Sequence, residues 1–159
     1  MQTCRRIIKN LKKTSVLISR KIALPVAMAL QVVIILFHFC VLIRWLPADI
    51  IWGGNVSSEN SFYLLESVSV LINILLLVCL LMYGNLIRSY LRPSVLRKIL
   101  GIFCILLLLS TIGNLMATTL VERLFSIPAL LMALLLWVLI RGSSGTDVPP
   151  INRQRETGR

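Results

Sequence analysis

Residues 50–73 read IIWGGNVSSENSFYLLESVSVLIN and lead from a short polar loop directly into an apolar helix. That helix carries an acid, Glu66, and an amide, Asn73, which lie seven residues apart and therefore share one face. Ionisable side chains are expensive inside a membrane. The stretch predicts a membrane-spanning helix and, within it, a polar feature that requires an explanation.

The composition is that of a membrane protein with one domain. The chain has 159 residues, of which 57% are hydrophobic and 14% are charged, and its mean hydropathy is +0.88. Soluble domains have about 45–50% apolar and about 25% charged residues. The chain has too few polar residues to cover its surface in water, so it is predicted to be an integral membrane protein.

Four apolar segments within residues 22–140 are each long enough to cross a hydrocarbon core of about 30 Å. They predict an all-α, polytopic fold, namely a four-helix transmembrane bundle. We expect the spans at about residues 22–43, 62–83, 99–120 and 124–140.

Three local features refine the expected bundle. Pro25 falls in the first turn of the first expected span, where its missing N–H costs little. Glu122 and Arg123 form a short turn, which makes the third and fourth spans antiparallel neighbours. Gly113 and Ala117 form a small-xxx-small pair, which predicts a close helix approach at this face.

The net charge of +11 is distributed as a topology signal. Fifteen of the 17 basic residues lie before the first span, between the second and third, or after the last. Only Arg44 and Arg123 lie in the other two connections. This asymmetry predicts that both termini are cytoplasmic. It also accounts for the basicity without nucleic acid, which we do not expect as a partner.

The two terminal segments differ from the bundle. Residues 1–21 form a basic amphipathic cytoplasmic segment without acids, which lies on anionic lipid headgroups or serves only as a solvated topology signal. Residues 141–159 are rich in Gly, Ser, Pro and charge and are predicted to be disordered. We expect the inner (plasma) membrane of a cell. The mitochondrial inner membrane is the alternative, because the basic start also fits a presequence.

The outer loop contains Trp52, Gly53 and Gly54. Paired glycines allow a tight turn beside the indole ring. The loop is either an interfacial turn anchored by tryptophan or a backbone nest that holds an anionic group.

Polar residues from three spans are expected at one depth. His38, Glu66 and Asn114 all fall within roughly 6–9 Å of the outer boundary, at about 1.5 Å of rise per residue. Gln31 shares a face with His38, seven residues away. Asn73 lies deeper on the face of Glu66, and Thr111 belongs to the polar stripe of Asn114. These residues either hold the helices together or form a ligand or ion site. For Glu66, a third reading is an exposed acid that pairs with Arg44 or Arg123.

A His–Glu pair favours a proton relay or a cation site, since imidazole titrates near neutral pH. One His and one Glu are too few for a zinc site, so we expect no metal. The sequence contains no nucleophile elbow, no H-E-x-x-H and no phosphate loop, and we therefore expect neither an enzyme nor a cofactor. The four cysteines form no C-x-x-C pair, and Cys79 and Cys104 are expected to pack as apolar residues.

Three short motifs resemble a group of small, uncharacterised four-helix membrane proteins of bacteria. They are the W-G-G loop, the E-x-x-S-x-x-x-N helix from Glu66 to Asn73, and the T-I-G-N helix from Thr111 to Asn114. The resemblance covers about residues 36–140 and implies a bacterial inner membrane. Asn55 follows the W-G-G where that group has a basic residue. No activity is implied.

Two functions from different classes remain open. The first is a small membrane protein with an outward-facing polar pocket that binds or passes a small solute, proton or cation. The second is an accessory protein that packs against a larger membrane partner and has no site of its own. A homo-oligomer fits either one, and an enzyme acting on lipid or quinone is the least favoured alternative.

Overall fold

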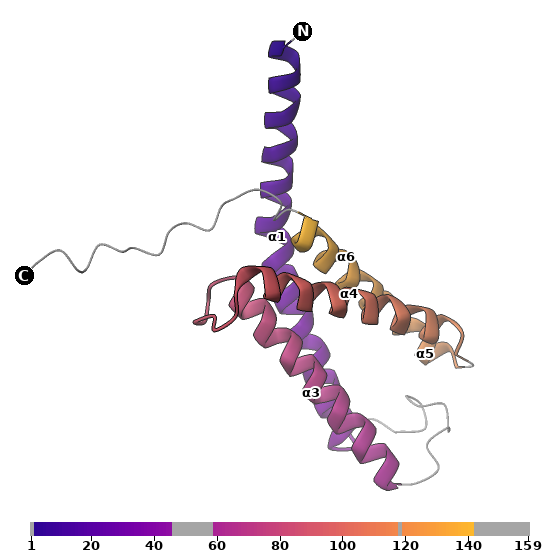
Figure 1. The fold of residues 1–159 in the computed structure, drawn as a ribbon. Coiled ribbons are helices and arrows are strands. Elements are labelled where there is room, and N and C mark those ends of the chain that lie inside the picture. Colours follow the sequence, from indigo (N-terminus) through magenta and orange to yellow (C-terminus); the bar gives the residue numbers. More distant parts are fainter. Residues whose placement is uncertain (1, 46–58, 118, 142–159) are drawn as a thin grey trace, which may run out of the picture.

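The structure is a computed structural model that describes residues 2–45, 59–117 and 119–141, with side chains from residue 21 onward. Every regular element in these ranges is a helix (Figure 1). The elements are α1 (Gln2–Leu42), α3 (Glu59–Tyr83), α4 (Pro93–Leu115), α5 (Leu120–Leu124) and α6 (Ser126–Arg141).

Four helical stretches are long and apolar enough to cross a membrane, which confirms the expected four-helix fold. The third stretch begins and ends earlier than expected, because Pro93 starts α4 as its first residue and the helix ends at Leu115. The fourth contains both α5 and α6. The stretches run over Lys21–Leu42, Glu59–Tyr83, Pro93–Leu115 and Leu120–Arg141.

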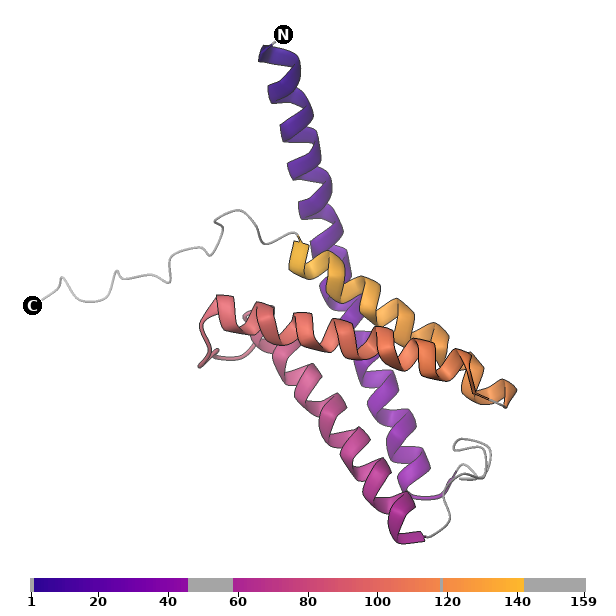
Figure 2. The same cartoon turned by 45° about the vertical axis from the view of Figure 1, so that its right-hand side comes forward.

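The bundle consists of two helical hairpins. α1 packs against α3, α4 packs against α6, and the hairpins are joined mainly where α1 meets α6, while α3 and α4 share little contact. In both views the hairpins cross at an angle, and the start of α3 points away from the end of α4 (Figures 1 and 2). The third and fourth spans are therefore neighbours, as expected.

The two ends of the bundle differ in charge. We call the end where α3 begins the acidic end, because it carries all three acids of the described residues, Glu59, Glu66 and Glu122. The other end, where α3 finishes and α4 begins, is the basic end. Its described basic side chains are Lys21, Arg88, Arg92, Arg97, Lys98 and Arg141.

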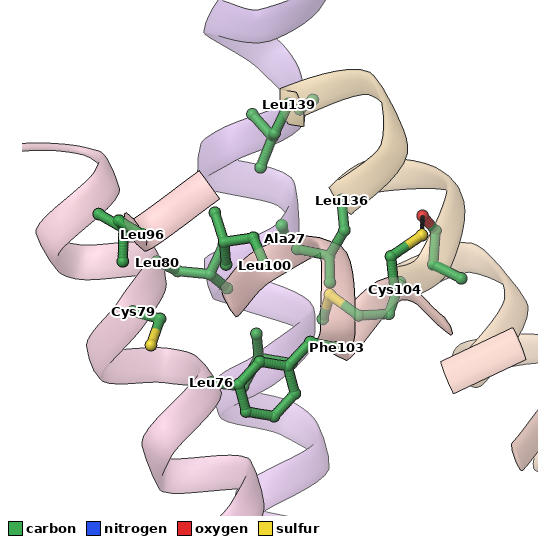
Figure 3. Close-up of a cluster of buried hydrophobic side chains, with 13 residues drawn as sticks. Ala27, Leu76, Cys79, Leu80, Leu96, Leu100, Phe103, Cys104, Leu136 and Leu139 are labelled. Atoms are coloured by element: carbon green, nitrogen blue, oxygen red, sulfur yellow. Dashed lines mark hydrogen bonds between the residues drawn. The ribbon is translucent and has the colours of Figure 1, made fainter. Parts of the chain in front are cut away.

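An apolar core joins the hairpins toward the basic end. Ala27 of α1, Leu80 of α3, Leu100 of α4 and Leu136 of α6 are all fully buried and belong to one cluster (Figure 3). Most other apolar side chains of the four spans are exposed, which fits helices surrounded by lipid. The fold thus buries a narrow apolar core and leaves a broad apolar exterior.

Close helix approach occurs at different small residues from those expected. Ala129 and Ala133 of α6 are buried, and the Cys104 thiol of α4 donates to the Ala133 carbonyl at 3.3 Å. Gly113 is exposed, and a Cβ added there would meet nothing within 4 Å. The expected close approach at Gly113 and Ala117 is therefore wrong, and the small-residue contact lies between Cys104 and the α6 alanines.

The first helix is longer than one span. α1 runs without interruption from Gln2 to Leu42, so the expected N-terminal segment is helical and continuous with the first span. Pro25 consequently lies in the helix interior. The prediction that it falls in the first turn of a helix is therefore wrong. Pro25 cannot donate to the carbonyl four residues earlier, and α1 lacks one backbone hydrogen bond there.

The connection between the second hairpin's helices is also different from the prediction. Glu122 and Arg123 lie in the short helix α5 and not in a turn. Thr119 caps α5 with a reciprocal capping box, in which its side chain accepts from the Glu122 N–H and the Glu122 carboxylate accepts from the Thr119 N–H. This capping box explains why Glu122 and Arg123 are helical.

Candidate functional site

Two of the predicted site residues meet directly between α1 and α3. His38 Nδ1 lies 2.6 Å from Glu66 Oε1, a distance typical of a charge-assisted hydrogen bond. The Glu66 side chain is only 1% exposed, whereas that of His38 is 23% exposed. The acid is therefore enclosed by protein, and the imidazole is the more accessible member of the pair.

The second oxygen of Glu66 lacks a donor. Oε2 is buried, and no described residue forms a hydrogen bond with it. Burying a carboxylate is unfavourable unless its oxygens are compensated, so this oxygen favours a bound proton, water or cation. The arrangement differs from a satisfied structural pair in this one atom.

A second polar pair lies one heptad deeper. The Gln31 amide nitrogen donates to the Asn73 side-chain oxygen at 2.7 Å and to the Asn73 carbonyl at 3.0 Å. The Asn73 amide in turn donates to the Ser69 carbonyl at 2.8 Å. Gln31 is fully buried, and its Oε1 also has no hydrogen-bond partner among the described residues.

A third polar pair lies at the acidic end. Arg44 donates to Glu59 at 2.9 Å, and its guanidinium lies near the rings of Phe62 and Tyr63. The hydrogen bond to Glu59 raises the pKa of Arg44 above its ordinary value, so the side chain stays charged. Arg44 follows the end of α1 with a positive φ of 58°, as the C′ residue of a Schellman motif.

Together these pairs form what we call the polar seam: Arg44–Glu59, His38–Glu66 and Gln31–Asn73. Each step is six or seven residues on α1 and seven on α3, so the pairs follow one face of each antiparallel helix. The equal spacing of Gln31 with His38 and of Glu66 with Asn73 indicated the two faces. The heptad from Glu59 to Glu66 was the signal for the third pair, which sequence reasoning missed.

The seam excludes one reading of Glu66. We had considered that Glu66 reaches the membrane surface and pairs with Arg44 or Arg123. Arg44 instead binds Glu59, and Arg123 donates to the Ala117 carbonyl at 2.8 Å. Glu66 is an interior residue that faces His38.

The remaining predicted site residues do not join the seam. Thr111 is buried on α4, but its hydroxyl donates to the Leu107 carbonyl of the same helix. Asn114 is half-buried, and no hydrogen bond links it to His38 or Glu66 in the described residues. The expected convergence of three helices is absent because the acidic ends of α3 and α4 diverge (Figure 2).

Two further expectations concern the loop and metals. Trp52, Gly53 and Gly54 lie outside the described residues. Within residues that the structure describes, no three His, Cys, Asp or Glu side chains lie close enough to hold a metal ion. The chemistry of the site therefore rests on one imidazole, one carboxyl and one pair of amides.

The described residues form an all-helical fold with four stretches long and apolar enough to cross a membrane, and three polar pairs lie between the first two. Comparison with known proteins found no matching family model, no similar curated protein and no similar solved structure.

Proposed function

We propose that this chain is a small multi-pass membrane protein whose His38–Glu66 pair binds a proton, or a small cation in its place. One observation carries the proposal. Glu66 is buried with His38 at 2.6 Å, yet its Oε2 has no donor among the residues that the structure describes. A proton on the pair, or a cation at Oε2, would compensate the buried carboxyl.

The position of His38, four residues before the end of α1, supports exchange with water at the acidic end. His38 is the only histidine of the chain, and its ring is partly exposed while the acid is not. Imidazole can gain and lose a proton between about pH 5 and 8. A pair that served only as structural glue would be expected to have both carboxyl oxygens satisfied.

We further propose an orientation in which the basic end and both termini face the cytoplasm. The charge difference between the two ends supports it. The pair then lies in the outer half of the membrane. The resemblance to small bacterial membrane proteins supports the inner membrane of a bacterium, with the mitochondrial inner membrane as the alternative.

The proposal is tested on the protein in lipid bilayers by NMR of the His38 ring nitrogens. Spectra are recorded across about pH 5 to 8, and then at one pH with added sodium, potassium or magnesium. Glu66→Gln is compared with the original chain. Glu59→Gln is the matched control, because it makes the same change seven residues earlier on the same helix, at an exposed acid.

We expect His38 signals that change with pH in the original protein and in Glu59→Gln, and that are altered in Glu66→Gln. A response to a cation at constant pH would identify the cation as the ligand. Signals that respond to neither pH nor cations would overturn the proposal. The pair would then be structural, as in an accessory protein that packs against a larger partner.

A further inference from the structure

We infer that the His38–Glu66 pair is a one-sided site: it exchanges its proton with the acidic end through the His38 ring and passes none to the basic end. This inference rests on the proposed function and decides between binding a proton and conducting it. Three features of the α1–α3 interface support it, namely the partly exposed imidazole, the amide pair one heptad deeper and the apolar core beyond that pair.

The imidazole is the route to the buried acid. Val41 of α1 and Phe62 of α3 are buried, and in sequence they lie between the Arg44–Glu59 pair and the His38–Glu66 pair, so the interface on the acidic side of the carboxyl contains apolar side chains. The partly exposed ring has Nδ1 at Glu66 Oε1. A proton taken up at Nε2, with release of the Nδ1 proton to Oε1, reaches Glu66 without exposing it. Protons are conserved in this exchange, and the ring ends neutral.

The amide pair stops the proton on the other side. The Gln31 nitrogen already donates to two oxygens of Asn73, and the Asn73 nitrogen donates to Ser69. The remaining Gln31 Oε1 can only accept a hydrogen bond. Carboxamides do not titrate as acids or bases in water. The Gln31–Asn73 pair can therefore accept a hydrogen bond at Gln31 Oε1 but cannot take up a proton and release it toward the basic end.

Beyond the amide pair the interior is apolar. Ala27, Leu76 and Leu80 are at most 2% exposed and pack with the α4 and α6 leucines toward the basic end (Figure 3). Such a core excludes water. The polar seam therefore ends near the middle of the α1–α3 interface.

Among the residues that the structure describes, no other charged group substitutes for His38. The titratable or charged residues at this end on α1 and α3 are Cys40, Arg44, Glu59 and Tyr63, and those on α5 are Glu122 and Arg123. Arg44 is bound to Glu59, Glu122 to Thr119, and Arg123 to a backbone carbonyl. None of the six forms a hydrogen bond or ion pair with His38 or Glu66.

The test uses the full chain in sealed vesicles with separate control of the internal and external pH. The infrared C=O band of protonated Glu66, assigned by its loss in Glu66→Gln, reports the state of the carboxyl. A cysteine at position 60, from Asn60→Cys, shows by its reaction with an impermeant reagent which side the acidic end faces. Decay of an imposed pH gradient reports conduction.

We expect the Glu66 band to follow the pH on the acidic side only, and the gradient to decay as slowly as in empty vesicles. A band that follows the pH on the basic side, or a gradient that decays faster than in empty vesicles, would overturn the inference. The proposed function would survive both results, because His38 would still respond to pH. If the His38 signals respond to neither pH nor cations in the NMR test, the proposed function itself is wrong.

Two variants test the route itself. His38→Gln keeps a hydrogen-bond donor but removes the relay, and we expect the band to lose its rapid response to a pH change. Thr111→Val is the control, because it removes a buried hydroxyl that bonds within α4, outside the polar seam, and the response should stay unchanged. A rapid response in His38→Gln, or its loss in a folded Thr111→Val protein, would show that the proton takes another path.

Discussion

The two oxygens of Glu66 have different environments, and this difference sets what the residue can do. Oε1 is tied to His38, while Oε2 is buried without a donor. An acid held on one side and unsatisfied on the other has its geometry fixed but its charge uncompensated. Gln31 also has a buried oxygen, Oε1, without a hydrogen-bond partner among the described residues. Because the amide is neutral, leaving this oxygen unpaired costs less than leaving a carboxylate oxygen unpaired.

Removing one partner of the pair should be worse than removing both. His38→Leu leaves the Glu66 carboxyl buried without its hydrogen bond to the imidazole, and we expect a loss of about 1–3 kcal/mol in the free energy of unfolding. Combining His38→Leu with Glu66→Leu should recover most of that loss, because two apolar side chains need no partner.

The cycle consists of the original chain, His38→Leu, Glu66→Leu and the double variant. Their free energies of unfolding in denaturing detergent give the coupling energy between His38 and Glu66. Thr111→Val is the control, since it deletes a buried hydroxyl that bonds within its own helix. Strictly additive losses for the two seam substitutions would contradict a direct interaction between His38 and Glu66.

The residues of the seam could be predicted only in part. Heptad spacing placed Gln31 with His38, and Glu66 with Asn73, because side chains seven apart share a helix face. Which residue of α1 would face which residue of α3 depends on the register of the two helices, and no residue type sets that register. Asn114 was misplaced for a related reason, since equal depth does not imply that helix ends converge.

At the scale of the helices, length and hydropathy were sufficient to identify the four spans. They could not identify the packing faces, because a lipid-facing leucine and a buried leucine are equally apolar. Gly113 and Ala117 have the spacing of a contact pair, but Gly113 is exposed and Ala117 is half-buried, whereas Ala129 and Ala133 have the same spacing and are both buried. Only the arrangement of α4 and α6 distinguishes them.

This distinction gives an element-scale prediction. Ala133→Leu places a large side chain where Cys104 meets the backbone of α6, and we expect it to lower the free energy of unfolding by about 1–3 kcal/mol. Gly113→Leu adds the same kind of side chain in open space, and it should not destabilise the protein. Thermal unfolding in detergent compares the two, and a greater loss for Gly113→Leu would contradict the observed packing.

For the whole molecule, the separation of charge between its ends predicts its orientation. A cysteine from Asn60→Cys lies at the exposed start of α3, and one from Ser94→Cys lies in the first turn of α4 at the basic end. An impermeant thiol reagent added to intact cells should label the first and not the second. The original chain controls for its own cysteines, and labelling in the reverse pattern would contradict the proposed orientation.

The unbroken first helix gives the molecule an arm. At about 1.5 Å per residue, the stretch from residue 2 to residue 21 extends roughly 30 Å beyond the bundle, a distance comparable to the membrane core. An arm of this length would reach well into the aqueous phase if it stood upright, and would reach the lipid headgroups if it bent over. Pro25 removes one hydrogen bond of α1 near the point where the arm joins the bundle, and kinks in long helices occur at proline. Pro25 therefore marks the place at which the arm would change direction relative to the bundle.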